Sequence, residues 1–174
     1  MQDWSRGEHI ENTEHYSLLR HITGLASGTA VEFGTGSGQS ARIMAEKLPV
    51  VTFGSIHGLP EDWRTDFPQG AFAYPLPEVD NATIIEGLFA DTLPAYDFSA
   101  LDIGLVHLDA DLYSSTAIAL DHVGPHLQPG CFLVFDEFWD YPGAEEHEQR
   151  ALRERDWSWR AVGTSHEAFA IQLI

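Results

Sequence analysis

The sequence predicts an α/β fold in which helices cover both faces of a mostly parallel sheet. Short apolar runs alternate with longer amphipathic runs along the chain. Strands that are apolar at every residue are typical of parallel sheets buried on both faces, and alternation with helices supplies the crossovers. Two apolar runs in the last twenty or so residues predict a C-terminal antiparallel hairpin. No linker divides residues 1–174, so a single domain is expected.

Seven strands and several helices follow from this alternation. The strands are expected at residues 29–33, 50–54, 81–87, 103–109, 131–137, 157–163 and 167–174. The helices are expected at residues 39–48, 114–127 and 145–155. Pro49 ends the first helix, and Ser114 or Ser115 offers an N-cap to the second. A loop rich in Pro and Trp fills residues 55–80.

The net charge excludes some classes of partner. Nine Lys and Arg residues face 27 Asp and Glu residues, which gives a formal charge of −18. Such a field repels phosphate backbones and anionic lipids, so neither nucleic acid nor a membrane is expected as a partner. A cation, either a metal ion or a sulfonium, is attracted; the alternative is an acidic surface that is merely solvated.

The cysteine content and the first residues bear on the compartment. Cys131 is the single cysteine, so it forms no internal disulfide and no Cys-based zinc site. The first 16 residues are polar and contain no apolar signal-peptide core. We therefore expect a cytoplasmic protein.

A glycine-rich loop follows the first strand, with Gly34, Gly36 and Gly38 spaced as G-x-G-x-G. Glycine lets the backbone approach a ligand closely, although a tight strand-to-helix turn needs the same residues. Glu32 precedes this loop, and its carboxylate would repel a pyrophosphate but pair with an amino group. The pattern therefore favours a cofactor with a cationic amino-acid portion over a nicotinamide dinucleotide.

Four carboxylates follow the fourth and fifth strands: Asp109, Asp111, Asp136 and Glu137. If these strands are neighbours, about 5 Å separates them and the carboxylates crowd one rim of the sheet. Ionised carboxylates this close need compensation, and Mg²⁺ or Mn²⁺ with oxygen ligands would supply it. The alternative is that Asp111 caps the next helix while the others are solvated.

Such a metal site would bind a substrate hydroxyl and lower its pKa, and a nearby base would then remove the proton. His57 lies near the same rim and is one candidate for this base. His107 shares a strand face with Asp109, so we expect it in the core or behind the metal ligands.

Five segments resemble the macrocin O-methyltransferase (TylF-like) family. They are VEFGTGSG, FGSIHGLPEDW, GLFADTLP, HLDADLYSST and LVFDEF, within about residues 30–150. The resemblance implies a Rossmann-like class I methyltransferase fold that binds S-adenosylmethionine. It further implies a Mg²⁺-assisted O-methyltransferase that acts on a hydroxyl of a small molecule, such as a sugar of a natural product.

The resemblance also assigns roles to particular residues. It makes Asp109, Asp136 and Glu137 metal ligands and Asp111 the general base; Glu137 replaces the usual aspartate. The methionine portion of the cofactor would contact Glu32 and the loop of Gly34, Thr35, Gly36, Ser37 and Gly38. Gly87 and Leu88 would lie near adenine, and Asp109 would also border the cofactor.

One departure from the family pattern concerns the ribose. The family has an aspartate at the end of the second strand, and this chain has Gly54. Hydrogen bonds left unmade there would weaken cofactor binding by about 1–3 kcal/mol, unless Ser55, His57 or water replaces them. A noncatalytic nucleoside-binding module or a decayed methyltransferase is therefore the alternative function. The oligomeric state stays open, with a homodimer the common arrangement for a small enzyme.

Overall fold

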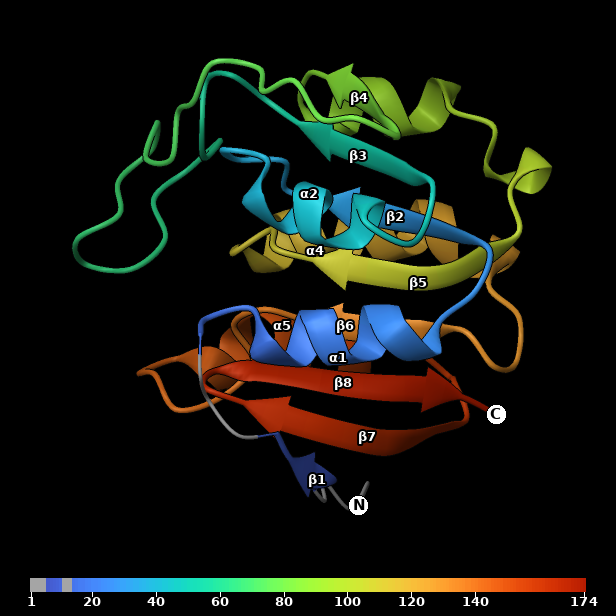
Figure 1. Cartoon of the computed structure of the whole chain (residues 1–174). Coiled ribbons are helices and arrows are strands. Elements are labelled where there is room, and N and C mark those ends of the chain that lie inside the picture. Colours follow the sequence, from blue (N-terminus) through green and yellow to red (C-terminus); the bar gives the residue numbers. More distant parts are fainter. Residues whose placement is uncertain (1–5, 11–13) are drawn as a thin grey trace.

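The computed structural model describes residues 6–10 and 14–174, which contain one eight-stranded sheet (Figure 1). The strand order is β1-β7-β8-β6-β5-β2-β3-β4. The strands are β1 (Glu8–His9), β2 (Thr29–Phe33), β3 (Val50–Gly54), β4 (Ala82–Glu86), β5 (Ile103–Leu108), β6 (Phe132–Phe135), β7 (Trp159–Ser165) and β8 (Ala168–Leu173). Neighbouring strands are parallel except β8, which is antiparallel to β6 and β7. The predicted fold class and the C-terminal hairpin are confirmed.

Helices cover both faces of this sheet. Helices α1 (Ser17–Leu25) and α2 (Gln39–Ala45) pack on one face, while α4 (Tyr113–Val123) and α5 (Glu148–Arg153) pack on the other (Figure 1). A short helix, α3 (Phe89–Thr92), follows β4. Because side chains alternate along a strand, Val31 and Phe33 of β2 face α4 and α5, while Ala30 faces α1 and α2. This two-sided burial explains why the strands are apolar throughout.

The sheet has one strand more than the seven predicted. Strand β1 consists of two exposed polar residues that pair in parallel with Gly163 and Thr164 of β7. A two-residue edge strand buries no side chain, so it leaves no hydrophobic pattern in the sequence.

The predicted helices are shorter in the structure, and the predicted N-cap is wrong. Helix α4 begins after Leu112, which makes no side-chain cap, and the Ser114 hydroxyl donates a hydrogen bond to Glu61 instead. It ends at Val123, because a 3₁₀ turn (Gly124–His126) containing Pro125 follows. Another 3₁₀ turn (Ala144–Glu146) precedes α5 and takes up the start of the predicted helix.

The order of the strands reverses between β2 and β5. From β2 the chain moves outward to β3 and β4, and it then returns to the other side of β2 to form β5 and β6. In open α/β sheets, ligands bind beyond the carboxyl ends of the strands at such a reversal. The topology therefore directs attention to the loops after β2, β5 and β6.

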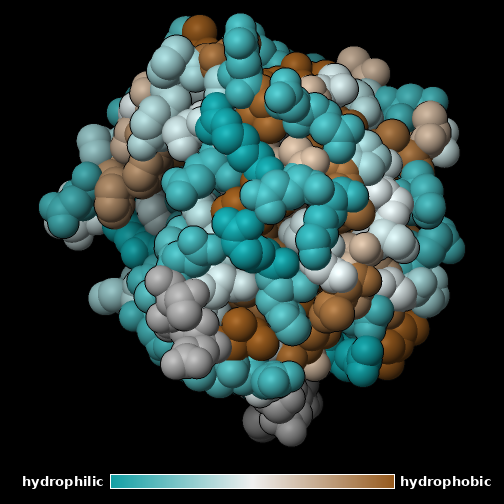
Figure 2. Space-filling model, viewed as in Figure 1, coloured by the Kyte–Doolittle hydropathy of each residue, from teal (hydrophilic) through white to brown (hydrophobic). Residues whose placement is uncertain are grey.

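Hydrophilic residues cover most of the face seen in Figure 2, with apolar residues in smaller patches. The long loop between β3 and β4 exposes Phe72, Tyr74 and Leu76, which are 39–49 % exposed. Among the described helices, none is long and apolar enough to span a membrane.

Candidate active site

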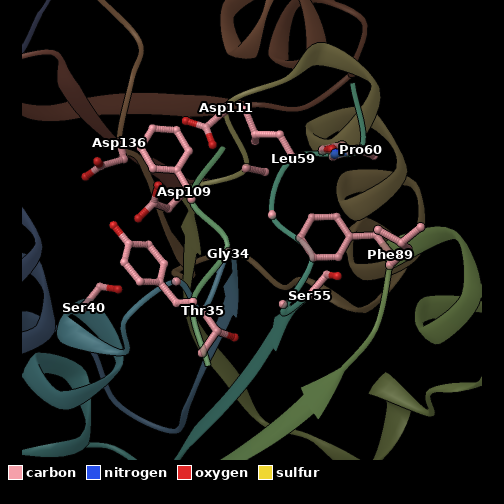
Figure 3. A pocket seen from close by; sticks show the side chains of 18 of the residues that line it. Gly34, Thr35, Ser40, Ser55, Leu59, Pro60, Phe89, Asp109, Asp111 and Asp136 are labelled. Atoms are coloured by element: carbon pink, nitrogen blue, oxygen red, sulfur yellow. The ribbon is translucent and has the colours of Figure 1, made fainter. Parts of the chain in front are cut away.

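A cavity of about 550 Å³ lies at the reversal of strand order, beyond the carboxyl ends of β2, β3, β5 and β6. Its wall includes Thr35 and Ser40 near the glycine loop, and Asp109, Asp111 and Asp136 gather on another side (Figure 3). The loop after β4 and part of the long loop complete the lining. Cavities of this size are typical of small-molecule sites.

The glycine loop presents its backbone to the cavity, as the sequence predicts. Gly34, Thr35, Gly36 and Ser37 line the cavity, and Gly38 does not. Gly34 has φ +113°, and a Cβ there would lie 1.8 Å from the carbonyl oxygen of Asp109. Only glycine therefore allows this loop to touch the end of β5. Gly38, with φ +78°, packs against Pro77 instead.

Thr35 fills the space beside Gly54, where the family pattern has an aspartate. A Cβ at Gly54 would lie 2.7 Å from the Thr35 Oγ1 atom and 2.9 Å from its backbone nitrogen. Thr35 is buried, and its hydroxyl lies 2.7 Å from that of Thr52. The space that the family's aspartate would need at Gly54 is therefore occupied, because Thr35 of the glycine loop lies there.

Glu32 does not line the cavity, which corrects its predicted role at the amino group of the cofactor. Its side chain is fully buried because it takes part in hydrogen bonding across the sheet. One carboxylate oxygen accepts a hydrogen bond from the Thr52 hydroxyl at 2.6 Å, and the other lies 3.1 Å from His107 Nδ1. These groups on β3 and β5 are the immediate strand neighbours of Glu32.

His107 continues the linkage to Asp136 and His15. His107 Nε2 lies 3.7 Å from Asp136 Oδ1, and His15 Nε2 lies 3.0 Å from Asp136 Oδ2. Burial alone would lower the pKa of His107, but Asp136 and Glu32 raise it to about 10. Although burial would raise the pKa of Asp136, the two histidines hold it well below its usual range. His107 is therefore a buried cation between two carboxylates, within the core as predicted.

Three other carboxylates form a group at the cavity. Single oxygens of Asp109, Asp111 and Glu137 lie within 4.8 Å of one another, close enough to share a cation. Asp111 holds this position with φ +59°, a left-handed conformation that aspartate adopts more readily than most residues. Asp136 lies outside this group, since its carboxylate faces the histidines; its predicted role as a ligand is not supported by this arrangement.

The raised pKa values of the three carboxylates show that burial and the neighbouring negative charges disfavour their ionised forms, which favours a bound cation. Burial, and then the charge of Asp136, raises the pKa of Asp109 and of Glu137 well above their usual values. The same two causes raise the pKa of Asp111 to about 7, although Arg64 acts in the opposite direction. The Glu137 Oε2 atom is buried and has no hydrogen-bond partner among the described residues. A divalent cation with oxygen ligands suits this donor set.

Arg64 of the long loop brings positive charge near the group, but other contacts hold it. Its guanidinium stacks on the rings of Trp63 and Tyr141, 3.9 and 3.7 Å from their centroids. It also pairs with Glu167 at 2.9 Å. The charge of Arg64 therefore only partly offsets the three carboxylates.

The other predicted site residues divide in two. Ser55, Gly87 and Leu88 line the cavity. His57 does not: it is exposed, and its backbone N–H donates a hydrogen bond to the Ser55 hydroxyl in a tight turn. His57 thus lies between lining residues without lining the cavity itself, and its role as a base stays a prediction.

Sequence reasoning missed His15, Tyr16, Arg64 and Glu148. His15 and Tyr16 line the cavity and come from the segment before α1, far from every motif. Burial and the nearby carboxylates, Asp109 first, raise the pKa of the Tyr16 hydroxyl, which therefore stays protonated. The sequence offers no spacing pattern for these residues, since tertiary packing alone brings them together.

Comparison with known proteins identifies the family and supports the fold. The sequence pattern of the macrocin-O-methyltransferase (TylF) family matches residues 69–156, half of the chain. A calicheamicin methyltransferase of known structure superposes with a TM-score of 0.72 at 20% identity, covering 91% of this chain and 76% of that one. The O-methyltransferase from Streptomyces achromogenes involved in tomaymycin synthesis was solved with S-adenosylmethionine. It superposes with a TM-score of 0.57 at 20% identity, covering 90% of this chain and 78% of that one.

Two relatives are similar in sequence. A tetracenomycin rhamnosyl 4'-O-methyltransferase of Streptomyces olivaceus is 33% identical over 53% of this chain and 39% of its own length. The mycinamicin III 3''-O-methyltransferase of Micromonospora griseorubida is 34% identical over 34% of this chain and 22% of its own. The match thus covers only 39% and 22% of the length of these two relatives. With half of its residues matched to the family pattern, the chain belongs to the macrocin O-methyltransferase (TylF) family.

Proposed function

We propose that the chain is an S-adenosylmethionine-dependent O-methyltransferase whose acceptor is a hydroxyl of a small molecule, of the sugar or natural-product class. The observation that carries this proposal is one cavity with a glycine loop on one side and a group of three carboxylates on another. The family supports it, and the two relatives are named as methyltransferases of glycosylated natural products.

The backbone of Gly34–Ser37 is the proposed cradle for the methionine portion of the cofactor. Gly87 and Leu88, with Phe89, border the part of the cavity proposed for adenine. Ser55 is the remaining predicted ribose contact on the wall, since Gly54 has no side chain and Thr35 blocks that position. When bound, S-adenosylmethionine supplies an electrophilic methyl group to the acceptor oxygen.

The proposed metal site consists of Asp109, Asp111 and Glu137, and Mg²⁺ or Mn²⁺ is the proposed ion. A divalent cation there would polarise the acceptor hydroxyl and lower its pKa. The buried, unpartnered Glu137 Oε2 and the raised pKa values of all three carboxylates support the fit. Asp136 instead orients His15 and His107.

Asp111 is the proposed general base. Asp111 lines the cavity and gives one oxygen to the group of three, which leaves its second oxygen to accept the proton of the acceptor hydroxyl. His15 joins His57 as a candidate, because it lines the cavity. Its hydrogen bond with Asp136 raises its pKa, which favours the charged form over proton acceptance.

Calorimetric titration with S-adenosylmethionine, with and without Mg²⁺, tests the proposal. We expect binding in both cases, and transfer of a labelled methyl group to glycosides or vicinal diols only with the metal. Absence of binding heat would overturn it. Binding without transfer to any acceptor would favour the second candidate, a noncatalytic nucleoside-binding module, which the lack of a ribose carboxylate at Gly54 supports.

The single domain over residues 1–174 and a homodimer remain proposals, as does the cytoplasmic location. Sedimentation analysis of the purified chain distinguishes a dimer from a monomer. Limited proteolysis tests the single domain, because one cooperative unit resists cleavage between its elements.

A further inference from the structure

Glu148, the first residue of α5, carries a buried carboxylate that has no partner. Its side chain is 0% exposed, and neither Oε1 nor Oε2 has a hydrogen-bond partner within the described part of the chain. A proton on either oxygen would not solve this, because the new O–H would also need an acceptor. Buried polar groups are normally hydrogen-bonded or bound to a ligand, so the two unpartnered oxygens of Glu148 point to a ligand.

The surroundings of Glu148 connect it with the three carboxylates at the cavity. After burial, the charges of Asp136, Asp109 and Asp111 raise the pKa of Glu148, and Glu148 in turn acts on Glu137. Helix α5 packs against α4, which begins two residues after Asp111. The residues on either side of Glu148 are bound to the segments that carry this group: His147 Nδ1 accepts a hydrogen bond from the Tyr113 N–H, and the Gln149 side chain donates one to the Phe138 carbonyl. Glu148 itself does not line the cavity.

We propose that Glu148 is a fourth carboxylate of the cation site, which binds the ion directly or through one water molecule. This inference rests on the metal site proposed above for Asp109, Asp111 and Glu137. Sites with several carboxylates around one divalent ion are common. Four carboxylates carry more negative charge than one divalent ion balances, and His107 and Arg64 offset part of the remainder. The buried carboxylate would then have a partner whenever the ion is bound.

Titration of Mn²⁺ into the protein, followed by calorimetry and electron paramagnetic resonance, tests the proposal. Glu148→Gln keeps the shape and removes the charge, and we expect it to weaken Mn²⁺ binding at least tenfold. Glu146→Gln is the matched control, because Glu146 is exposed two residues earlier and makes the same charge change; its affinity should stay within twofold. Equal affinity of wild type and Glu148→Gln would overturn the inference.

The same titration separates this inference from the proposed function. A wild-type protein that binds no Mn²⁺ would overturn both the metal site and the role of Glu148, whereas S-adenosylmethionine binding in a separate cell would still support the cofactor site. Thermal unfolding distinguishes a merely structural role. In a chelator, Glu148→Gln should melt at or above wild type, and Mn²⁺ should raise its melting temperature less. A variant that melts lower or fails to fold in the chelator would overturn the inference.

Discussion

Two sets of polar side chains lie side by side at the carboxyl ends of the strands, and they differ in how their charges are satisfied. The linked set consists of Thr35, Thr52, Glu32, His107, Asp136 and His15, which contact one another in that order. The acidic set consists of the carboxylates of Asp109, Asp111 and Glu137, with Glu148 as its proposed fourth member. The linked set pairs carboxylates with histidines and hydroxyls of the fold, although the 3.7 Å between His107 Nε2 and Asp136 Oδ1 is too long for a hydrogen bond. For the acidic set we propose a bound cation as the partner. The difference separates residues that hold the site in place from those available for binding.

The largest effect is expected from breaking the linked set at Glu32. Glu32→Gln leaves the charged His107 buried beside one carboxylate fewer. The free energy of unfolding, measured in urea, should therefore fall by about 3–5 kcal/mol. Glu46→Gln is the control, because that carboxylate is exposed and its ion pair with Arg20 contributes little. A loss below about 1 kcal/mol for Glu32→Gln would mean that the linked set does not stabilise the fold.

The stabilisation that the linked set gives through His107 should depend on pH. Because the folded pKa of His107 is about 10 and the unfolded pKa about 6.5, its contribution is fully present below pH 6.5. This contribution is lost as the pH rises through about 10, by about 3–4 kcal/mol between pH 7 and pH 10. Urea unfolding between pH 7 and pH 10 should show that loss in wild type and much less of it in His107→Gln. Parallel curves for the two proteins would contradict the account.

Adding a carboxylate to the linked set should also destabilise the protein. Gly54→Asp restores the acid of the family pattern, but its Cβ would meet Thr35 at 2.7 Å. We expect a loss of about 2 kcal/mol from overpacking and no gain in S-adenosylmethionine affinity. A stable Gly54→Asp protein that binds the cofactor more tightly would show instead that the ribose position is open.

The smallest effect, and one of opposite sign, is expected in the acidic set. Glu137→Gln removes one of several like charges, so in a chelator the variant should be about 1 kcal/mol more stable, a rise of about 2–4 °C in melting temperature. Added Mn²⁺ should stabilise wild type more than the variant. A lower melting temperature in the chelator would show that Glu137 already has a partner.

The sequence predicts much of this site because the ends of the strands can be located from their apolar runs. Apolar runs locate β2, β5 and β6, and parallel strands bring the residues that follow them to one edge. The glycine loop and the neighbourhood of Asp109 and Glu137 therefore follow from pattern alone. The predicted partner of Glu32 is a ligand, whereas its contacts in the structure are Thr52 and His107, which lie beside it on the neighbouring strands.

The remaining residues could not be predicted for a physical reason. His15 reaches the cavity from the segment before α1, and Glu148, which we propose for the cation site, begins α5. Neither spacing nor composition marks these two residues in the sequence. Their positions depend on how helices pack across the sheet, which no local pattern encodes. The same holds for Arg64, whose place between Trp63 and Tyr141 depends on the path of the long loop.

The most direct test of the central claim is a crystal soaked with Mn²⁺ and S-adenosylhomocysteine, measured for anomalous scattering at the manganese edge. The account predicts one strong peak among Asp109, Asp111 and Glu137, with Asp136 still bound to His15. A peak between Asp136 and the histidines, or no peak in a crystal that contains the nucleoside, would contradict it.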